Sequence, residues 1–110
     1  MQQVNVDEAV LQEIVRRLVE ALEPDKIILF GSRARGDALP RSDFDLLIIK
    51  DSDEPPHRRD ARAYRAVGMV GACKDLLWYT PSEVVQWADA TNHVIARALR
   101  EGRVLYEKAR

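Results

Sequence analysis

The sequence predicts an α+β fold in which a small mixed β-sheet is packed by helices. Three observations support this prediction: an apolar stripe at helical spacing near the N-terminus, three short apolar runs typical of buried strands, and helical patterns between and after those runs. The 110 residues, 46% hydrophobic and 32% charged, are typical of a folded chain rather than a disordered one. We therefore expect one domain over residues 1–110, long enough to bury a core.

An amphipathic helix is predicted near the N-terminus. Asp7 is suited to cap its start, and Pro24 ends it because proline disfavours the helical conformation of the residue before it. Its apolar positions share one face: Val10, Leu11, Ile14, Val15, Leu18, Val19 and Leu22. The apolar run Lys26–Phe30 then predicts a short buried strand.

Two more strands are predicted further along the chain, at Asp43–Lys50 and Lys74–Thr80. The polar connection Gly31–Pro40 separates the first two strands without a full crossover helix, and loops of this length often carry function. Between the second and third strands, the charged loop Asp51–Pro56 leads to a helix in the first part of His57–Val70. The three strands would form the small sheet on which the helices pack.

The C-terminal third predicts two helices and a last short strand. Thr80 is a suitable N-cap for a helix over about 81–90, which has proline at its first position. A second helix is predicted over Asn92–Arg100, ended by Gly102 in a left-handed cap. Val104–Tyr106 predicts an edge strand, and an open edge leaves self-association as a homodimer possible.

Composition excludes several classes of function. Seventeen Lys and Arg against eighteen Asp and Glu leave a net charge of -1, so no overall basic field favours nucleic acid or membrane. The apolar stretches are far shorter than the roughly 20 residues that a membrane helix needs. Cys73 is the lone cysteine and cannot close an internal disulfide, and with two histidines it falls short of a structural zinc site. We therefore expect a cytoplasmic protein.

Gly31 and Ser32 follow the first predicted strand directly. Glycine lets a ligand approach the backbone, and a serine at the start of a helix lies where free N–H groups can bind phosphate. The alternative is a simple tight turn in which Ser32 caps a short helix. Arg33 and Arg35 are likewise either phosphate contacts or solvated loop arginines.

Three aspartates lie where predicted strands begin. Asp43 and Asp45 are two positions apart, so they point to one face of the second strand, with Cα atoms roughly 6.6 Å apart. Asp75 begins the third strand, and it joins this pair if the two strands are neighbours. Three such carboxylates suit Mg²⁺, which prefers oxygen ligands. The alternative is that each is only a solvated residue at a strand end.

The spacing Gly31-Ser32, ten residues, then Asp43-x-Asp45 resembles the signature of the minimal nucleotidyltransferases of the polymerase-beta-like superfamily. The flanking sequence KIILFGSRARGDALPRSDFDLLII is similar to the core of that family almost without interruption. Asp75 stands where the family has its third carboxylate, and residues 98–106 resemble its usual ending. The resemblance covers roughly residues 9–107, and the segment over 51–71 is its least characteristic part.

The resemblance implies a transferase that moves a nucleoside monophosphate from an NTP, ATP by family habit, to an acceptor hydroxyl. Gly31 and Ser32 would contact the β- and γ-phosphates, and Asp43 and Asp45 would bind two Mg²⁺ ions. Asp75 would bind the catalytic ion and help to deprotonate the acceptor. The minimal members pair with a small helical HEPN protein, often as antitoxin to its ribonuclease activity, and some attach AMP to a tyrosine of that partner.

Two other functions stay open at this point. One is a binding-only antitoxin that neutralises its partner by contact; the other is adenylylation of a small molecule such as an aminoglycoside. A repeat of arginines in the middle segment indicates either a solvated helix face or a contact for triphosphate, RNA or an acidic partner: Arg58, Arg59, Arg62 and Arg65. Trp78, Tyr79 and Trp87 are either part of the core or candidates for a partner surface.

Overall fold

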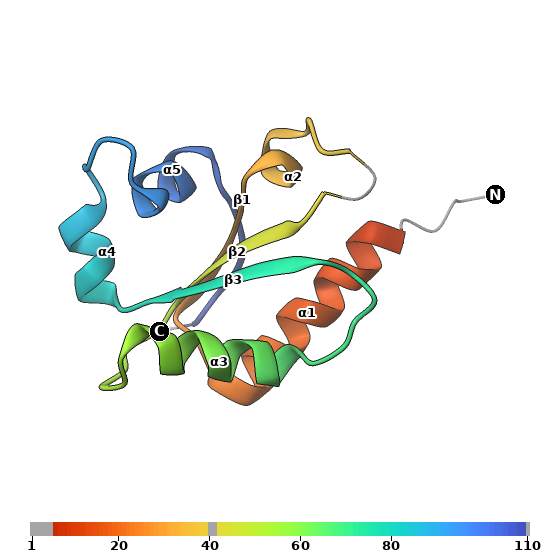
Figure 1. The fold of residues 1–110 in the computed structure, drawn as a ribbon, viewed down its shortest axis with the longest axis horizontal. Coiled ribbons are helices and arrows are strands. Elements are labelled where there is room, and N and C mark those ends of the chain that lie inside the picture. The colour runs from red at the N-terminus through yellow and green to blue at the C-terminus, as the bar shows by residue number, and fades with distance from the viewer. Residues whose placement is uncertain (1–5, 40–41, 110) are drawn as a thin grey trace.

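The computed structural model describes residues 6–39 and 42–109 and has an α+β fold (Figure 1). The end of the predicted loop at Pro40 lies outside the described residues. Five helices and four strands follow one another within the described ranges: α1 (Val6–Leu22), β1 (Lys26–Phe30), α2 (Ser32–Arg35), β2 (Phe44–Ile49), α3 (Pro56–Val67), β3 (Lys74–Tyr79), α4 (Pro81–Trp87), α5 (Val94–Glu101) and β4 (Arg103–Glu107).

The four strands form one mixed sheet with the order β3-β2-β1-β4. β1 pairs with β2 and with β4 in antiparallel fashion, whereas β2 and β3 are parallel. Helices α1 and α3 cover one face of the sheet, and α4 and α5 lie on the other side (Figure 1). The starts of β2 and β3 lie at the same end of the sheet, and α2 is at that end too (Figure 1). This topology confirms the prediction of a small mixed sheet packed by helices.

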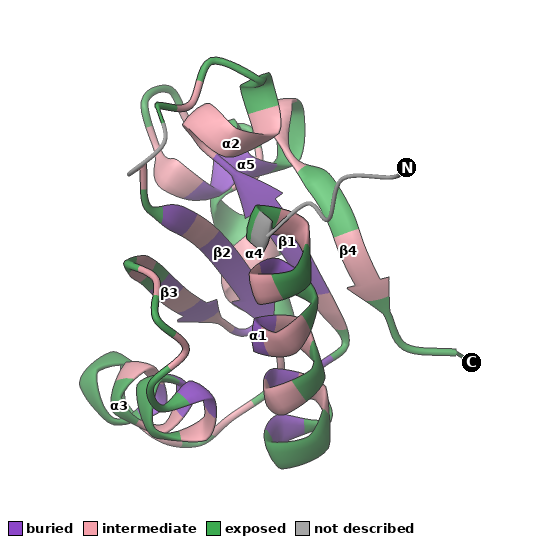
Figure 2. Ribbon diagram, turned by 90° about the vertical axis from the view of Figure 1, so that its right-hand side faces the viewer, coloured by how far each residue is buried: buried purple, intermediate pink, exposed green. Residues whose placement is uncertain are grey.

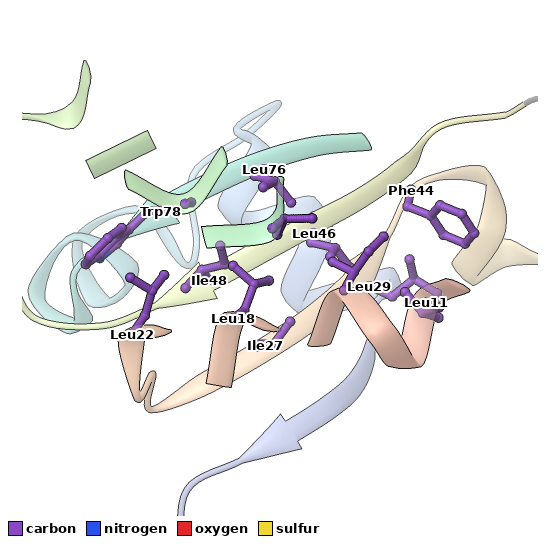
Figure 3. Packing of buried hydrophobic residues seen from close by; sticks show 13 residues of the cluster. Leu11, Leu18, Leu22, Ile27, Leu29, Phe44, Leu46, Ile48, Leu76 and Trp78 are labelled. Carbon is purple, nitrogen blue, oxygen red and sulfur yellow. The ribbon is translucent and has the colours of Figure 1, made fainter. Parts of the chain in front are cut away.

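The main core lies between the sheet and the two helices α1 and α3. Alternation along the strands sends every second side chain into it, so Leu46 and Ile48 of β2 meet Leu18 of α1 (Figure 3). Residues recurring at helical spacing along α1 are buried, as the apolar stripe predicted, and they appear as purple bands along that helix in Figure 2. Trp78, only 2% exposed, belongs to this core and is excluded as a partner surface.

A smaller core lies on the opposite face of the sheet, beneath α4 and α5. Its buried members come from β1, β2 and α5: Ile28, Phe30, Leu47, Ile49 and Ala98. Val84 of α4, Val94 of α5 and Tyr79 of β3 pack against it while staying partly exposed. Because this face is covered over only part of its length, polar side chains at the starts of β2 and β3 can reach solvent on it.

The local signals for helix ends were partly correct. Thr80 caps α4 in a full capping box, in which its hydroxyl accepts from Glu83 N–H and the Glu83 carboxylate accepts from Thr80 N–H. The prediction for Gly102 was wrong: its φ of -77° is not left-handed. A Cβ there would overlap Ala98 O and a methyl of Ile28, so glycine is needed for close packing instead.

Two helix starts also differ from the prediction. α1 already includes Val6 and Asp7, so Asp7 lies within the first turn rather than at the cap. α5 begins at Val94, and the side chain of His93 caps it by accepting from Ile95 N–H at 3.1 Å. Among the helices that the structure describes, none is long and apolar enough to cross a membrane.

Candidate active site

The strand pairing brings the three predicted aspartates to one face of the sheet. β2 and β3 are parallel, and Asp45 is the direct register partner of Asp75, so their Cα atoms are about 4.8 Å apart. Asp43 precedes β2 by one residue and lies two positions before Asp45, on the same side by alternation. Opposite them on β1, Phe30 is paired with Asp45, which places the Gly31-Ser32 turn beside the carboxylates.

Gly31 and Asp45 are in close contact. Gly31 has φ 75°, a region that favours glycine, and it forms the N-cap of α2. A Cβ at this position would overlap Oδ2 of Asp45. Glycine is therefore required here both for its backbone conformation and for the space that the Asp45 carboxylate occupies.

The carboxylate of Asp45 is electrostatically strained. Burial raises its pKa above the usual value, and the charges of Asp75 and Asp43 raise it further, whereas Arg35 opposes the shift. Like charges that destabilise one another in this way would be relieved by a bound cation. Asp43 and Asp75 are both exposed, so a soluble ligand can reach the group.

The donor chemistry fits a divalent cation with a preference for oxygen ligands, such as Mg²⁺. Three carboxylates on one face, one of them with a raised pKa, form a hard, negatively charged donor set. Across the described ranges, no three acidic, histidine or cysteine side chains are already gathered closely enough to hold an ion. Side-chain rotation would therefore be needed to bring the carboxylates onto one ion.

Ser32 is the first residue of α2 and is partly exposed at the same end of the sheet. The turn is built by backbone hydrogen bonds, since the carbonyl of Gly31 accepts from both Ala34 N–H and Arg35 N–H at 3.1 Å. Gly36 closes α2 in the left-handed conformation, donating to Ser32 O. The sequence motif thus forms a one-turn helix beside Asp45, so its serine is within the candidate site.

The two arginines of α2 point to different parts of the molecule. Arg33 packs its guanidinium over the Phe44 ring, 4.1 Å from its centre, and bonds to Ser42 O and Asp7. Because Phe44 belongs to the main core, Arg33 lies on the other face from the carboxylates and is not brought together with them. Arg35 bonds to Asp37 and Glu101 and is close enough to lower the pKa of Asp45.

Tyr64 contacts the site although nothing in the sequence pattern singled it out. It lies on α3, and its hydroxyl is 3.3 Å from Oδ1 of Asp75. The same hydroxyl accepts a hydrogen bond from Leu76 N–H at 3.0 Å. The only available sequence signal was its place in the helix that precedes β3, which does not specify a contact with Asp75.

The arginines of α3 do not form one solvated stripe. Arg59 is 3% exposed, and it binds both carboxylate oxygens of Glu83 as well as Trp78 O. Arg62 pairs with Glu54 and lies over the Trp78 ring. Arg58 and Arg65 are exposed. At least two of the four therefore have structural roles, which weakens the case for a continuous basic binding face.

Comparison with known proteins agrees with this geometry. Residues 12–110 match the sequence model of the family described as polymerase beta, nucleotidyltransferase. A candidate nucleotidyltransferase from Sulfolobus solfataricus superposes with a TM-score of 0.62 at 19% identity, over 97% of this chain and 91% of that chain. No curated protein sequence matches this chain.

A second solved structure, of a toxin–antitoxin with AMP-PNP, superposes with a TM-score of 0.57 at 16% identity, over 96% of this chain and 75% of that chain. Both identities are low, so these two likenesses establish the fold alone. The family match is different in kind because it spans nearly the whole chain. On that ground the chain belongs to the polymerase beta nucleotidyltransferase family.

Proposed function

We propose that this chain is a Mg²⁺-dependent nucleotidyltransferase that transfers AMP from ATP to a hydroxyl group on a partner protein. The observation that carries the proposal is the register pairing of Asp45 with Asp75, next to Gly31, where an added Cβ would overlap Oδ2 of Asp45. Family membership supports the transfer of a nucleotide as the reaction class. It does not specify the nucleotide or the acceptor.

Each residue of the site has a role that its chemistry allows. Asp43 and Asp45 would hold two Mg²⁺ ions, one of which Asp75 would also bind, and these ions would neutralise charge on the triphosphate. Gly31 and Ser32 would bind the β- and γ-phosphates through the backbone and hydroxyl of the turn. Arg35, beside Asp45, is a candidate for a phosphate contact once it leaves Asp37, whereas we assign no nucleotide contact to Arg33.

The proposed step is an in-line displacement. The acceptor oxygen attacks the α-phosphorus of ATP, a new phosphorus–oxygen bond forms, and the bond from the α-phosphorus to the bridging oxygen breaks. Asp75 takes the proton from the acceptor hydroxyl, and pyrophosphate leaves with the electron pair of the broken bond. Positioning and charge neutralisation account for the catalysis, so no covalent intermediate with the chain is required.

The partner is proposed to be a small helical protein of the HEPN type, with this chain as its antitoxin. One of the structural neighbours is a toxin–antitoxin complex with AMP-PNP, which supports both a protein partner and an adenine nucleotide. Tyr79 and Trp87, together with exposed Val85, lie on β3 and α4 as apolar candidates for the contact surface. The acceptor would then be presented to the carboxylates by the partner itself.

The test is to incubate the purified chain with Mg²⁺, ATP and a candidate small helical partner of the HEPN type, and to weigh that partner intact. We expect the mass of one or more AMP groups to be added, with GTP, CTP and UTP giving less. The paired variant Asp43→Asn with Asp45→Asn should abolish the addition. Asp53→Asn, an exposed carboxylate beyond the other end of β2, is the matched control and should leave it intact.

The same variants separate catalysis from simple binding. If the doubly substituted chain still neutralises toxicity of the partner in cells as well as the native chain, contact alone suffices and the binding-only antitoxin is the better account. Absence of any nucleotide addition to the partner by the folded native chain, with all four NTPs, would contradict the proposed activity. Addition of AMP to an aminoglycoside in a parallel reaction would indicate a small-molecule acceptor instead of a partner protein.

A further inference from the structure

The outer edge of β3 is closed by side chains from α3 rather than by another strand. β3 is the last strand of the sheet on its side, so the N–H groups on its outer edge have no strand partner. Trp78 N–H donates to Asp60 Oδ1 at 3.1 Å, and Leu76 N–H donates to the Tyr64 hydroxyl at 3.0 Å. Asp60 and Tyr64 therefore perform the same structural task at neighbouring positions along one edge.

Tyr64 differs from Asp60 in one contact. A phenol hydroxyl can donate one proton as well as accept, and the Tyr64 hydroxyl already accepts from Leu76 N–H. The proton is directed to Oδ1 of Asp75, 3.3 Å away.

We propose that Tyr64 is a positioning residue for the third carboxylate of the active site, which it holds by one oxygen while Leu76 N–H fixes the hydroxyl to the strand. This inference rests on the proposed function, in which Asp75 binds metal and takes a proton. With Oδ1 engaged by Tyr64, Oδ2 stays available for the metal ion or for the acceptor hydroxyl. Removing a residue that orients a metal-binding carboxylate typically lowers metal affinity or activity about 10- to 100-fold.

The geometry favours positioning over a purely structural role. The Tyr64 side chain is 39% exposed, so removing its hydroxyl creates no cavity in the core. Asp75 is itself exposed, and without a partner its carboxylate would sample several rotamers in water. The contact joins α3, which packs against β3 from the core side, to a side chain on the opposite face of the same strand. The α3 helix thereby reaches the catalytic face around the sheet edge.

The experiment compares Tyr64→Phe with Asp60→Ala, a matched control. Each variant leaves one β3 edge N–H without its side-chain partner, but only Tyr64→Phe removes a hydrogen bond to Asp75. Binding of Mn²⁺ is measured by electron paramagnetic resonance, with an ATP analogue whose α–β bridge cannot be cleaved. We expect Tyr64→Phe to weaken Mn²⁺ binding about 10-fold or more, and Asp60→Ala to change it less than about twofold.

Transfer to the partner protein supplies the second readout. Tyr64→Phe should lower kcat about 10- to 100-fold while leaving KM for ATP unchanged, because the phosphates are bound by the Gly31 turn on another element. Equal Mn²⁺ affinity in Tyr64→Phe and the native chain would overturn the positioning role, and so would an equal loss in Asp60→Ala. If the native chain binds Mn²⁺ but transfers nothing, the proposed function fails while the binding comparison still decides this inference. If it binds no Mn²⁺, both fail.

Discussion

Like charges lie close together at the start of β3, whereas opposite charges are paired just beyond its end. At its start, Asp75 is level with Asp45, and the like charges raise the pKa of the partly buried Asp45. Beyond its end, the Glu83 carboxylate accepts from Nη1 and Nη2 of the buried Arg59 and from Thr80 N–H. These contacts lower the pKa of Glu83 to about 2. The second arrangement stabilises the fold, and the first costs stability.

The comparison indicates where function lies in this small sheet. A buried ion needs an opposite charge and hydrogen bonds, and Arg59 has both in its contacts with Glu83, although its Nε has no hydrogen-bond partner among the described residues. Uncompensated carboxylates beside a glycine turn have no structural benefit, so their presence favours a role in binding. Removing one charge or one contact at a time, at the start of β3 and beyond its end, tests whether only the start serves function.

The largest expected effect is on catalysis, at the start of β3. Asp75→Asn keeps a carbonyl oxygen that can accept from Tyr64 but removes the negative charge and the proton acceptor. AMP transfer to the partner should fall at least about 1,000-fold, or roughly 4 kcal/mol of transition-state stabilisation. Single-turnover kinetics measure this loss. A residual rate above about one tenth of the native rate would remove Asp75 from the mechanism.

The second largest loss of transfer activity is expected on substitution of Gly31. Gly31→Ala would place a Cβ against Oδ2 of Asp45 on a backbone with positive φ, so we expect transfer to fall roughly 100-fold. Gly36→Ala provides the control, because Gly36 also has positive φ but a Cβ there would meet nothing within 4 Å. Gly36→Ala should lose about 1 kcal/mol of unfolding free energy because Gly36 is left-handed, and Gly31→Ala should lose more, because a φ of 75° with a ψ of -158° is a conformation that essentially only glycine adopts. A comparable loss of activity in both would mean that strain alone explains the result.

Beyond the end of β3, where opposite charges are paired, Glu83→Gln leaves Arg59 buried without its ionic partner. We expect the unfolding free energy to fall by about 2–3 kcal/mol, somewhat less than for a fully buried pair because the Glu83 side chain is 29% exposed. Denaturation in urea measures this change. Glu20→Gln, which breaks an ion pair with both side chains more than half exposed, is the control and should have little effect.

The stability difference between the native chain and Glu83→Gln should depend on pH. Because the folded-state pKa of Glu83 is lowered from 4.5 to about 2, its contribution is complete above the unfolded pKa of about 4.5. It is lost progressively as the pH falls from there toward about 2. Urea melts at pH 7 and pH 3 should therefore give a smaller gap at pH 3. A gap that is independent of pH would mean that Glu83 acts through its shape and not its charge.

The smallest expected effect is a gain in stability when Asp45, level with Asp75 at the start of β3, loses its charge. Asp45 has a raised pKa, so its charged form opposes folding as the pH rises through that value. Asp45→Asn removes this cost, so without metal at pH 7 the unfolding free energy should rise. Thermal melts with and without Mg²⁺ and ATP check it, since ligand should stabilise the native chain only. A less stable Asp45→Asn chain would contradict the electrostatic account.

Local sequence signals were sufficient for most of the framework. The apolar runs placed β1, β2 and β3 within one or two residues, and Thr80 with Pro81 marked the start of α4 correctly. Strand alternation likewise places Asp43 and Asp45 on one face. In these cases the cause is contained in a few consecutive residues. Asp75 was expected to join the pair only if the two strands were neighbours, and the parallel pairing of β2 with β3 meets that condition.

The remaining features depend on contacts between distant segments. Arg33 and Arg35 are equivalent in the sequence, yet Arg33 packs on Phe44 across the sheet and only Arg35 influences Asp45. Tyr64 reaches Asp75 only because α3 packs beside β3. The position of Gly102 was identified correctly, but its reason is the approach of Ile28 rather than a left-handed cap. No local pattern encodes these three-dimensional neighbours.

A crystal structure of the chain with Mg²⁺ and an ATP analogue that cannot be cleaved between the α- and β-phosphates tests the central claim most directly. The account predicts an ion about 2.1 Å from carboxylate oxygens of Asp43, Asp45 and Asp75, with the triphosphate against the turn at Gly31 and Ser32. Magnesium and nucleotide bound at another face, with Asp45 and Asp75 left apart, would contradict it.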